Sequence, residues 1–331
     1  MYTVQFYPNR IVTTWRKETR FGDGAINIVN KIYKREQRRI SNQNLSKHKT
    51  SVNLSASSKR LIRDSINGMY VLSKPRTIKL PNNKIIYNYR QSFITLTLPS
   101  KQIHTDVEIK SCLNNFLTSL RQSIGVKNYV WKAELQQNEN IHFHLVIDKY
   151  CSYQAIRHYW NKAINKLGYV DRYSERFNKL TLKEYCELRN IPVNKGIKAY
   201  NNGKLSKWES PNSVDVVSVR TDRDVSNYLS KYFAKSDDSN IDEDRIRAFG
   251  RVWSRSQSLS RLKYINKFDL SEINSYLKEL IASKRGVYVK SYDFCKVIYL
   301  SISKVKKSLI KFFIKMLNYN AKNWNYPFPA T

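Results

Sequence analysis

Acidic residues are scarce in this sequence. Its 331 residues include 59 Lys and Arg against 26 Asp and Glu, so the formal net charge is +33 at pH 7. This excess disfavours a cationic partner and favours a polyanion, because each Lys or Arg placed on a phosphate releases condensed counterions. The 23 Tyr, 13 Phe and 6 Trp suit unpaired bases, which stack on aromatic rings, although they would equally fill an ordinary core.

Cysteines are few and far apart. Four are present, with no CxxC pair, which disfavours both a Cys-rich zinc site and a disulfide framework. The sequence also lacks an apolar run of about 18 residues, a basic stretch followed by an apolar segment at its start, and the phosphate-binding pattern GxxxxGK[ST]. We therefore expect a cytoplasmic protein that is not secreted, has no membrane span and has no helicase domain.

The order of expected elements predicts an α+β fold. Strands alternate with helices between residues 75 and 262, which indicates an antiparallel sheet backed by helices. We divide the sequence into a basic polar N-terminal extension (1–55), a central domain (56–262) with a polar insertion (174–212), and a basic helical C-terminal region (263–331). A helix is expected near Ile26–Ile40 in the first part, and the last part predicts helices over 269–283 and 303–317.

Two of the five histidines stand two residues apart in IHFHLVI, which is predicted to be a strand. Residues i and i+2 of a strand point to the same face. His142 and His144 can therefore converge on one metal ion, while Phe143 points into the core. Paired histidines also occur on solvent-exposed strand faces, so the pair alone leaves metal binding open.

Glu134 is the candidate third ligand. It lies in the preceding strand, which the polar stretch QNEN joins to the histidine strand as a hairpin. If Gln137 pairs with Ile141 across a three-residue turn, Glu134 lies opposite His144 and shares its face, whereas a two-residue turn puts it on the far face. Its alternative role is a salt bridge with a lysine. Two imidazoles and a carboxylate would suit Mg²⁺ or Mn²⁺, although Zn²⁺ binds such a set tightly in vitro.

The stretch NYLSKYFAKS carries two tyrosines one helical turn apart. Tyr228 and Tyr232 would share one helix face, with Lys231 and Lys235 close by. A tyrosine can attack a phosphodiester and conserve the bond energy as a covalent phosphotyrosine. Its phenol, with a pKa of about 10, needs help from a metal or a lysine. Tyrosines at this spacing are also common packing residues, so the pattern alone does not establish catalysis.

Together, the stretches FITLTLPS, IHFHLVID and YLSKYFAK resemble, in this order, motifs one to three of the HUH endonucleases. More narrowly, the chain resembles the two-tyrosine rolling-circle replication initiators of small single-stranded DNA bacteriophages and of related prophages and plasmids. The stretches VWKAELQQNEN and GRVWSRSQSLSR add to the resemblance, which covers residues 56–262. Glu139 is a departure, because the hairpin turn of relatives often has glycine there.

The resemblance implies a ferredoxin-like sheet with the His-x-His pair on a central strand. It implies a metal-dependent nickase and strand transferase that starts rolling-circle replication by cutting and rejoining single-stranded origin DNA through a covalent 5′-phosphotyrosine. A host helicase and a host polymerase, in the cytoplasm of a bacterial cell, would be partners. By position, the metal ligands would be His142, His144 and Glu134, the nucleophiles Tyr228 and Tyr232, and the helpers at the phosphate Lys231 and Lys235.

Two other functions are compatible with the sequence. A relaxase or a single-tyrosine transposase could use the same histidines and glutamate, although a second tyrosine argues against the transposase. A non-catalytic single-stranded DNA-binding protein would need only the positive charge and the aromatic residues.

Overall fold

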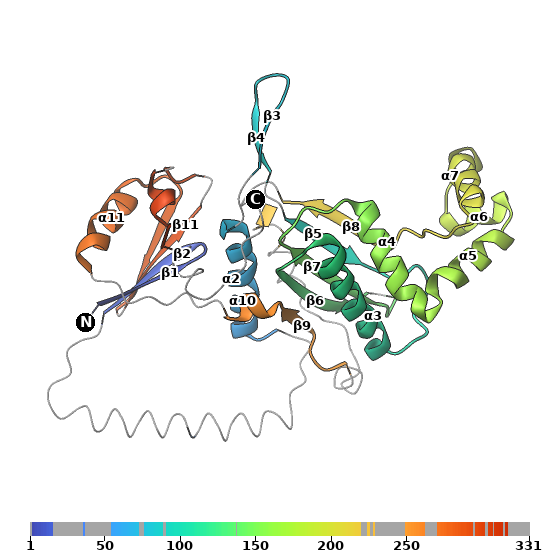
Figure 1. Cartoon of the computed structure of the whole chain (residues 1–331), viewed down its shortest axis with the longest axis horizontal. Helices are drawn as coiled ribbons and strands as arrows, with labels where there is room; N and C mark the ends of the chain where they lie inside the picture. Colours follow the sequence, from blue (N-terminus) through green and yellow to red (C-terminus); the bar gives the residue numbers. More distant parts are fainter. Residues whose placement is uncertain are drawn as a thin grey trace. The chain divides into compact units, whose positions relative to one another are not determined.

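The computed structural model (Figure 1) describes residues 2–15, 36, 54–72, 76–88, 91–136, 138–219, 224, 225, 228, 249–261, 270–293, 295–301, 304–306, 308–313, 315 and 316. The chain divides into two compact units. The first comprises residues 1–72, 225–250 and 261–326, and the second comprises residues 73–224, 251–260 and 327–331. No helix among the described residues is both long enough and apolar enough to cross a membrane.

The second unit is built on a five-stranded antiparallel sheet in the order β8-β5-β7-β6-β9. The strands are β5 (Ser92–Leu96), β6 (Tyr129–Leu135), β7 (Ile141–Ile147), β8 (Val214–Ser218) and β9 (Trp253–Arg255). Helix α3 (Asp106–Ser119) links β5 to β6, and α4 (Tyr153–Ile164) links β7 to β8. This β5-α3-β6-β7-α4-β8 succession, with β9 added at one edge, is the ferredoxin-like arrangement. The predicted α+β fold, with the histidine pair on a central strand, is confirmed.

Helices α3 and α4 cover one face of this sheet. Phe143 of β7 is fully buried and packs edge-on against Trp160 of α4, with ring centroids 6.1 Å apart. Trp160 in turn packs against Phe116 of α3, at 5.7 Å. Because successive side chains of a strand alternate between faces, His142 and His144 belong to the opposite face of the sheet.

Local signals start these helices where the sequence places them. Thr105 and Glu108 form a reciprocal capping box at the start of α3, and the Ser152 side chain accepts a hydrogen bond from the Ala155 backbone N–H at the start of α4. Such caps satisfy amide groups that have no partner inside the helix. The two helices therefore begin at fixed points relative to the strands they follow.

A group of three helices occupies the region expected to be a polar insertion. Helices α5 (Tyr169–Lys179), α6 (Leu182–Arg189) and α7 (Val193–Leu205) follow the end of α4. They surround a small apolar core of their own, made of Tyr173, Phe177, Tyr185, Cys186 and Trp208. The sequence analysis missed this core because its aromatic residues are spread among charged ones.

The first unit contains a four-stranded antiparallel sheet in the order β1-β2-β11-β10. Its strands are β1 (Tyr2–Tyr7), β2 (Arg10–Trp15), β10 (Val287–Ser291) and β11 (Cys295–Leu300), and helices α2 (Ala56–Leu72) and α11 (Leu270–Ala282) belong to the same unit. The Arg10 guanidinium donates two hydrogen bonds, of 2.6 and 2.9 Å, to the buried Asp64 carboxylate of α2. This pair of hydrogen bonds ties the sheet to the helix.

Both ends of the chain differ from the expected basic polar and helical extensions. Strand β2 pairs with β11, so the two ends contribute strands to one sheet. Runs as short as these become strands only through the partner they meet, and the sequence does not show that partner. The helix expected over 269–283 is confirmed by α11. The helix expected near Ile26–Ile40 lies outside the described residues apart from Glu36. Residues 76–88 form the expected hairpin of β3 (Arg76–Lys79) and β4 (Ile85–Asn88), while α10 (Gln257–Arg261) follows β9.

The turn between β6 and β7 has three residues, but it is placed one position earlier than expected. Gln136, not Gln137, closes the turn, because its N–H donates to the Asn140 carbonyl at 2.9 Å. Glu139 is in the left-handed region, with φ of 65°. This conformation costs an ordinary L residue free energy that glycine avoids, which gives a physical reason for glycine at this place in relatives.

Replacing Glu139 with glycine is expected to stabilise the second unit by about 1 kcal/mol, since the left-handed conformation costs an L residue about 1–2 kcal/mol. Urea unfolding of the full chain, followed by tryptophan fluorescence, measures the change. Glu139→Ala is the matched control, because it removes the carboxylate and keeps the Cβ. An equal stabilisation by alanine would attribute the effect to charge and contradict the backbone explanation.

Candidate metal centre

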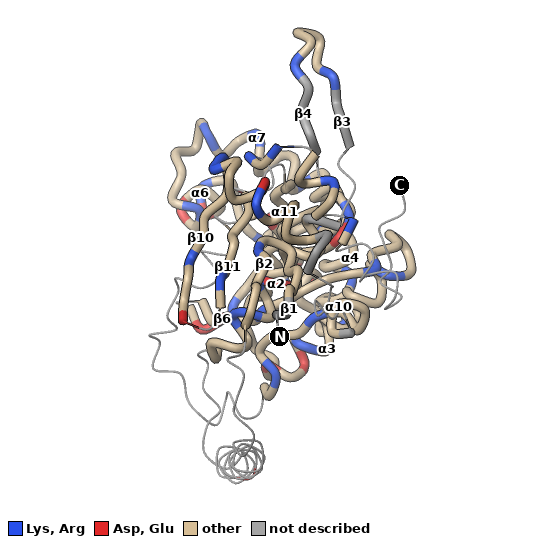
Figure 2. The backbone as a smooth tube through the Cα atoms, turned by 90° about the vertical axis from the view of Figure 1, so that its left-hand side faces the viewer, with Lys and Arg blue, Asp and Glu red and all other residues tan. Residues whose placement is uncertain are grey.

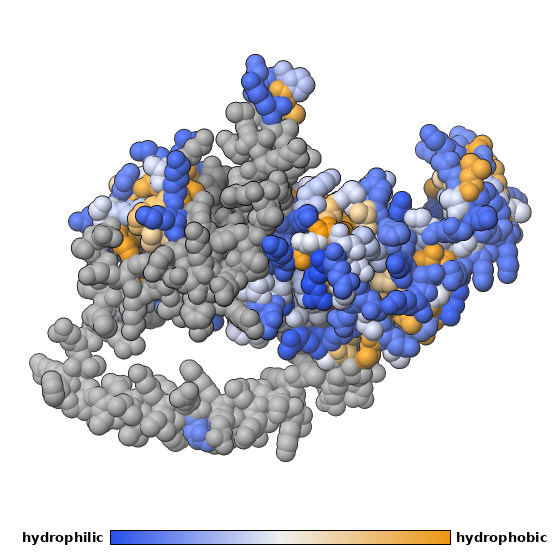
Figure 3. Space-filling view, in the orientation of Figure 1, coloured by the Kyte–Doolittle hydropathy of each residue, from blue (hydrophilic) through white to orange (hydrophobic). Residues whose placement is uncertain are grey.

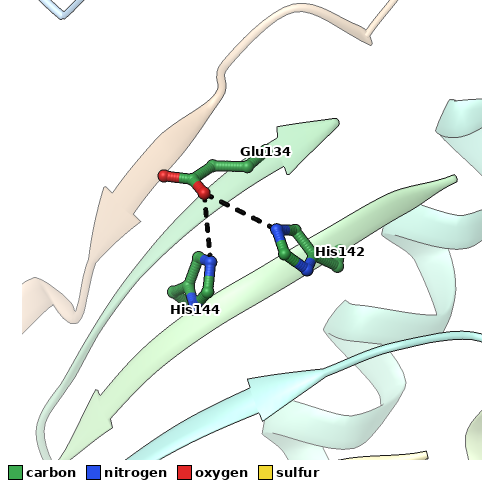
Figure 4. A group of neighbouring side chains, drawn as sticks. All are labelled: Glu134, His142 and His144. Carbon is green, nitrogen blue, oxygen red and sulfur yellow. Dashed lines mark hydrogen bonds and ion pairs between the residues drawn. The ribbon is translucent and has the colours of Figure 1, made fainter. Parts of the chain in front are cut away.

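Strands β6 and β7 bring Glu134, His142 and His144 onto one face of the sheet (Figure 4). Glu134 pairs with His142, and Lys132 pairs with His144. The expected pairing of Glu134 with His144 is therefore wrong by two residues. The shared face is nevertheless as expected, because a shift of two residues preserves the alternation of side chains.

The potential ligand atoms of these three residues all lie within 4.8 Å of one another. Glu134 Oε2 is 3.1 Å from His144 Nε2 and 3.5 Å from His142 Nε2. Two ligands bound at about 2.1 Å from one ion are about 3.0 Å apart in octahedral and about 3.4 Å apart in tetrahedral geometry. The side chains thus fit a small divalent ion with little rearrangement, and two nitrogens and one oxygen are suitable donors for it.

Lys132 holds the other oxygen of the glutamate. Its Nζ donates a 2.6 Å hydrogen bond to Glu134 Oε1, and the lysine is almost completely buried. The salt bridge considered as an alternative for Glu134 therefore coexists with the cluster instead of replacing it. With Oε1 engaged by Lys132, Oε2 is the oxygen that faces the two imidazoles (Figure 4).

The charge state of Glu134 follows from opposing effects. Burial disfavours its charged form, but hydrogen bonds with His142, His144 and Lys132, together with the charge of Lys132, outweigh burial and hold the pKa of the carboxyl well below its usual range. The group is therefore a carboxylate at neutral pH. Only this deprotonated form is an effective metal ligand.

Thr95 of β5 contacts the far side of the His144 ring. Its Oγ1 lies 3.2 Å from His144 Nδ1, and the two residues are paired across the strands. A hydrogen bond to the second ring nitrogen fixes the orientation of a ligating imidazole. Neither Thr95 nor Lys132 was among the predicted site residues. The alternation in FITLTL could have placed Thr95 on the right face, but its contact depends on strand order.

The row of residues across the sheet at His144 is open to solvent on one side. It runs Asp215, Thr95, His144, Lys132 and Trp253, from β8 to β9. Asp215 at one edge is exposed, whereas Lys132 is buried. The His144 side chain is 18% exposed and that of His142 9%. A phosphate oxygen can therefore approach from the His144 side.

The predicted tyrosine helix is described only in part. Asp224, Val225 and Tyr228 are helical, and Tyr228 is half-buried. Tyr232, Lys231 and Lys235 lie outside the described residues. Their proposed roles stay predictions from the sequence.

Replacing Thr95 with valine is expected to weaken Mn²⁺ binding roughly tenfold to a hundredfold, as loss of a contact that orients a ligating histidine does. Isothermal titration of the full chain with Mn²⁺ measures the affinity. Thr97→Val is the matched control, because Thr97 Oγ1 donates to the Ser213 carbonyl and not to a histidine. Equal affinities of the two variants would contradict the role given to Thr95.

One family matches the segment that carries the cluster. Residues 91–237 match the family of the replication-associated protein ORF2, a family of rolling-circle replication initiators. The matched segment extends from β5 past Tyr228 and Tyr232. No curated protein and no solved structure matches the chain. The resemblance to rolling-circle replication initiators is therefore confirmed over residues 91–237.

Proposed function

We propose that this protein starts rolling-circle replication as a metal-dependent nickase that cuts and rejoins single-stranded DNA through a phosphotyrosine. The observation that carries the proposal is the cluster of Glu134, His142 and His144, which lies inside the segment similar to replication initiators. Relaxases share such a cluster, but the matched family favours replication. A plain DNA-binding protein would not need a buried carboxylate facing two imidazoles.

In the proposed reaction, a phenolic oxygen of Tyr228 or Tyr232 attacks the scissile phosphorus. The bond from phosphorus to the 3′ oxygen breaks, and this oxygen leaves as a hydroxyl after taking a proton. The 5′ phosphate is now esterified to tyrosine. Attack by a later 3′ hydroxyl reverses the exchange and reseals the strand, so no bond energy is lost.

Each residue of the site has a defined task in this proposal. Glu134, His142 and His144 hold a divalent ion, Mg²⁺ or Mn²⁺, whose chemistry is to polarise the scissile phosphate. Lys132 and Thr95 keep the glutamate and His144 in place. Lys231 and Lys235 stabilise charge at the phosphate or on the phenolate. The nick leaves a free 3′ hydroxyl for a host polymerase, and a host helicase would unwind the duplex ahead of it.

A covalent adduct is the first test. The full chain is incubated with Mn²⁺ and labelled single-stranded oligonucleotides that tile the DNA element encoding it. We expect an adduct that survives denaturation and is lost in the double variant Tyr228→Phe, Tyr232→Phe. Tyr150→Phe, which changes an exposed tyrosine, is the control and should retain it. Mass spectrometry of the adduct peptide identifies the attacking residue, and absence of an adduct with every metal tried would refute the proposal.

Metal dependence is the second test. We expect His142→Ala to abolish cleavage while DNA affinity stays within about twofold, because the ligand acts in the chemical step and not in binding the DNA backbone. Cleavage assays and fluorescence anisotropy with the same oligonucleotide measure the two effects. His158→Ala, at an exposed position of α4, should change neither. A parallel loss of cleavage and affinity in His142→Ala would mean that this histidine is structural.

A further inference from the structure

Helix α7 is exposed along nearly its whole length. Among its 13 residues only Gly196 and Gly203 are buried. Both glycines face the small core, where a Cβ would overlap Cys186 and the Trp208 ring. They let the helix backbone lie directly on the core. Its longer side chains consequently point outward, and the helix presents a broad face that no described residue covers.

The path of the chain into α7 has the form of a helix-turn-helix. Helix α6 ends at Asn190, whose φ is 50°, and α7 begins after Pro192, so three residues join the two helices. The Tyr200 hydroxyl donates to the Leu180 carbonyl at 2.8 Å, and Lys204 Nζ donates to the Asn178 carbonyl at 2.6 Å. These bonds fix α7 against the turn between α5 and α6. A supported, exposed second helix is the part of such motifs that enters the DNA major groove.

The outward face of α7 has the chemistry of a DNA-binding surface. Residues 193–207 contain four lysines and no acidic residue, whereas residues 169–192 contain four acidic residues. The exposed side chains along the outward face are Asn194, Lys195, Lys198, Asn201 and Leu205. Asparagine amides can bond adenine, lysines can bond guanine or phosphate, and apolar groups can contact the thymine methyl.

Helix propensity does not explain these residues. Asparagine is a poor helix former, and an exposed helix position is ordinarily filled by Ala, Glu, Lys or Gln. Figure 3 shows apolar surface beside hydrophilic surface over α7. Val193 and Ile197 are 46% and 43% exposed, and Leu205 is 84% exposed. Over the described part of the chain Lys and Arg are spread widely while Asp and Glu are sparse (Figure 2), which favours an anionic partner.

We propose that α7 is a recognition helix that binds the major groove of double-stranded DNA. This surface is separate from the metal cluster, which lies on the sheet. The inference rests on the proposed function in one respect: an initiator must recognise its origin as a duplex before a single strand is available for nicking. Duplex binding itself is a property of α7 and can be measured whether or not the chain cuts DNA.

The first experiment separates duplex binding from general attraction to DNA. The full chain with Lys195→Ala and Lys198→Ala is compared with the control Lys162→Ala and Lys166→Ala, which removes the same charge at exposed positions outside the three-helix group. The probes are a fluorescent duplex of about 30 base pairs, roughly three turns of B-DNA, and one of its single strands. We expect the α7 variant to lose duplex affinity roughly tenfold or more, and its salt dependence to fall by about two charges.

The proposal is overturned if the control loses as much duplex affinity as the α7 variant, or if affinity for the single strand falls in parallel. It is also overturned if duplex affinity is unchanged while the substitutions abolish self-association, because the surface would then bind a second copy. Nicking of single-stranded oligonucleotides should be unaffected. If the wild-type chain fails to nick but the duplex result holds, the proposed function fails and this inference stands.

The second experiment tests base recognition. Duplexes are selected from a randomised pool with the wild-type chain, and Asn194→Ala and Asn201→Ala are each measured against the selected and the random duplex. We expect the preference for the selected duplex to fall roughly fivefold or more, since an amide bonded to adenine discriminates between bases. Alanine is the better helix former, so unfolding of α7 would not explain the loss. An unchanged preference in both variants would contradict base recognition by α7.

Discussion

The antiparallel pairing of β6 with β7 is the constraint on which the candidate site depends. It sets Glu134 beside His142 and Lys132 beside His144, so one hairpin supplies all three potential ligands and the cation that holds one of them. A slip by a single residue would send Glu134 and Lys132 into the apolar face that α3 and α4 cover. The turn that fixes this register closes between Gln136 and Asn140 and holds Glu139 in a left-handed conformation. The site thus depends on backbone geometry outside it.

Short-range patterns in the sequence sufficed for much of this unit. Alternation predicted the strands that carry Glu134, His142 and His144, and helix periodicity and caps predicted α3 and α4. Partners in space could not be predicted in this way. Thr95 reaches His144 because β5 lies next to β7 in the sheet, and that order does not follow from any local pattern. The same limit explains why the sheet joining β2 to β11 was missed.

The small core under α5, α6 and α7 was missed for another reason. Cys186 and the aromatic residues Tyr173, Phe177, Tyr185 and Trp208 are separated by charged residues, so no single window of sequence looks apolar. Their convergence requires Gly196 and Gly203, which let α7 approach the core. Glycines inside a helix usually weaken it. Here they are compatible with a helix because close packing compensates for the loss.

Electrostatics of the cluster bear on the choice of substrate. Without a metal, the buried ammonium of Lys132 balances the carboxylate of Glu134. A bound divalent ion would leave the cluster with a net positive charge in a place of limited solvent access. Such a charge attracts an anion strongly, because water screens it poorly. The hydrogen bond from Lys132 would therefore do more than hold the glutamate, since it also leaves the site in need of the negative charge that a phosphodiester supplies.

The sheet of the first unit has a consequence for how the chain is made. Strand β2 cannot find β11 until about 280 further residues have been synthesised, which at about 5–20 residues per second takes roughly 15–60 s. Residues 73–224, which form the greater part of the second unit, leave the ribosome during this interval. The order of synthesis thus gives the cluster-bearing unit time to fold around its own sheet while β1 and β2 wait for their partner strand.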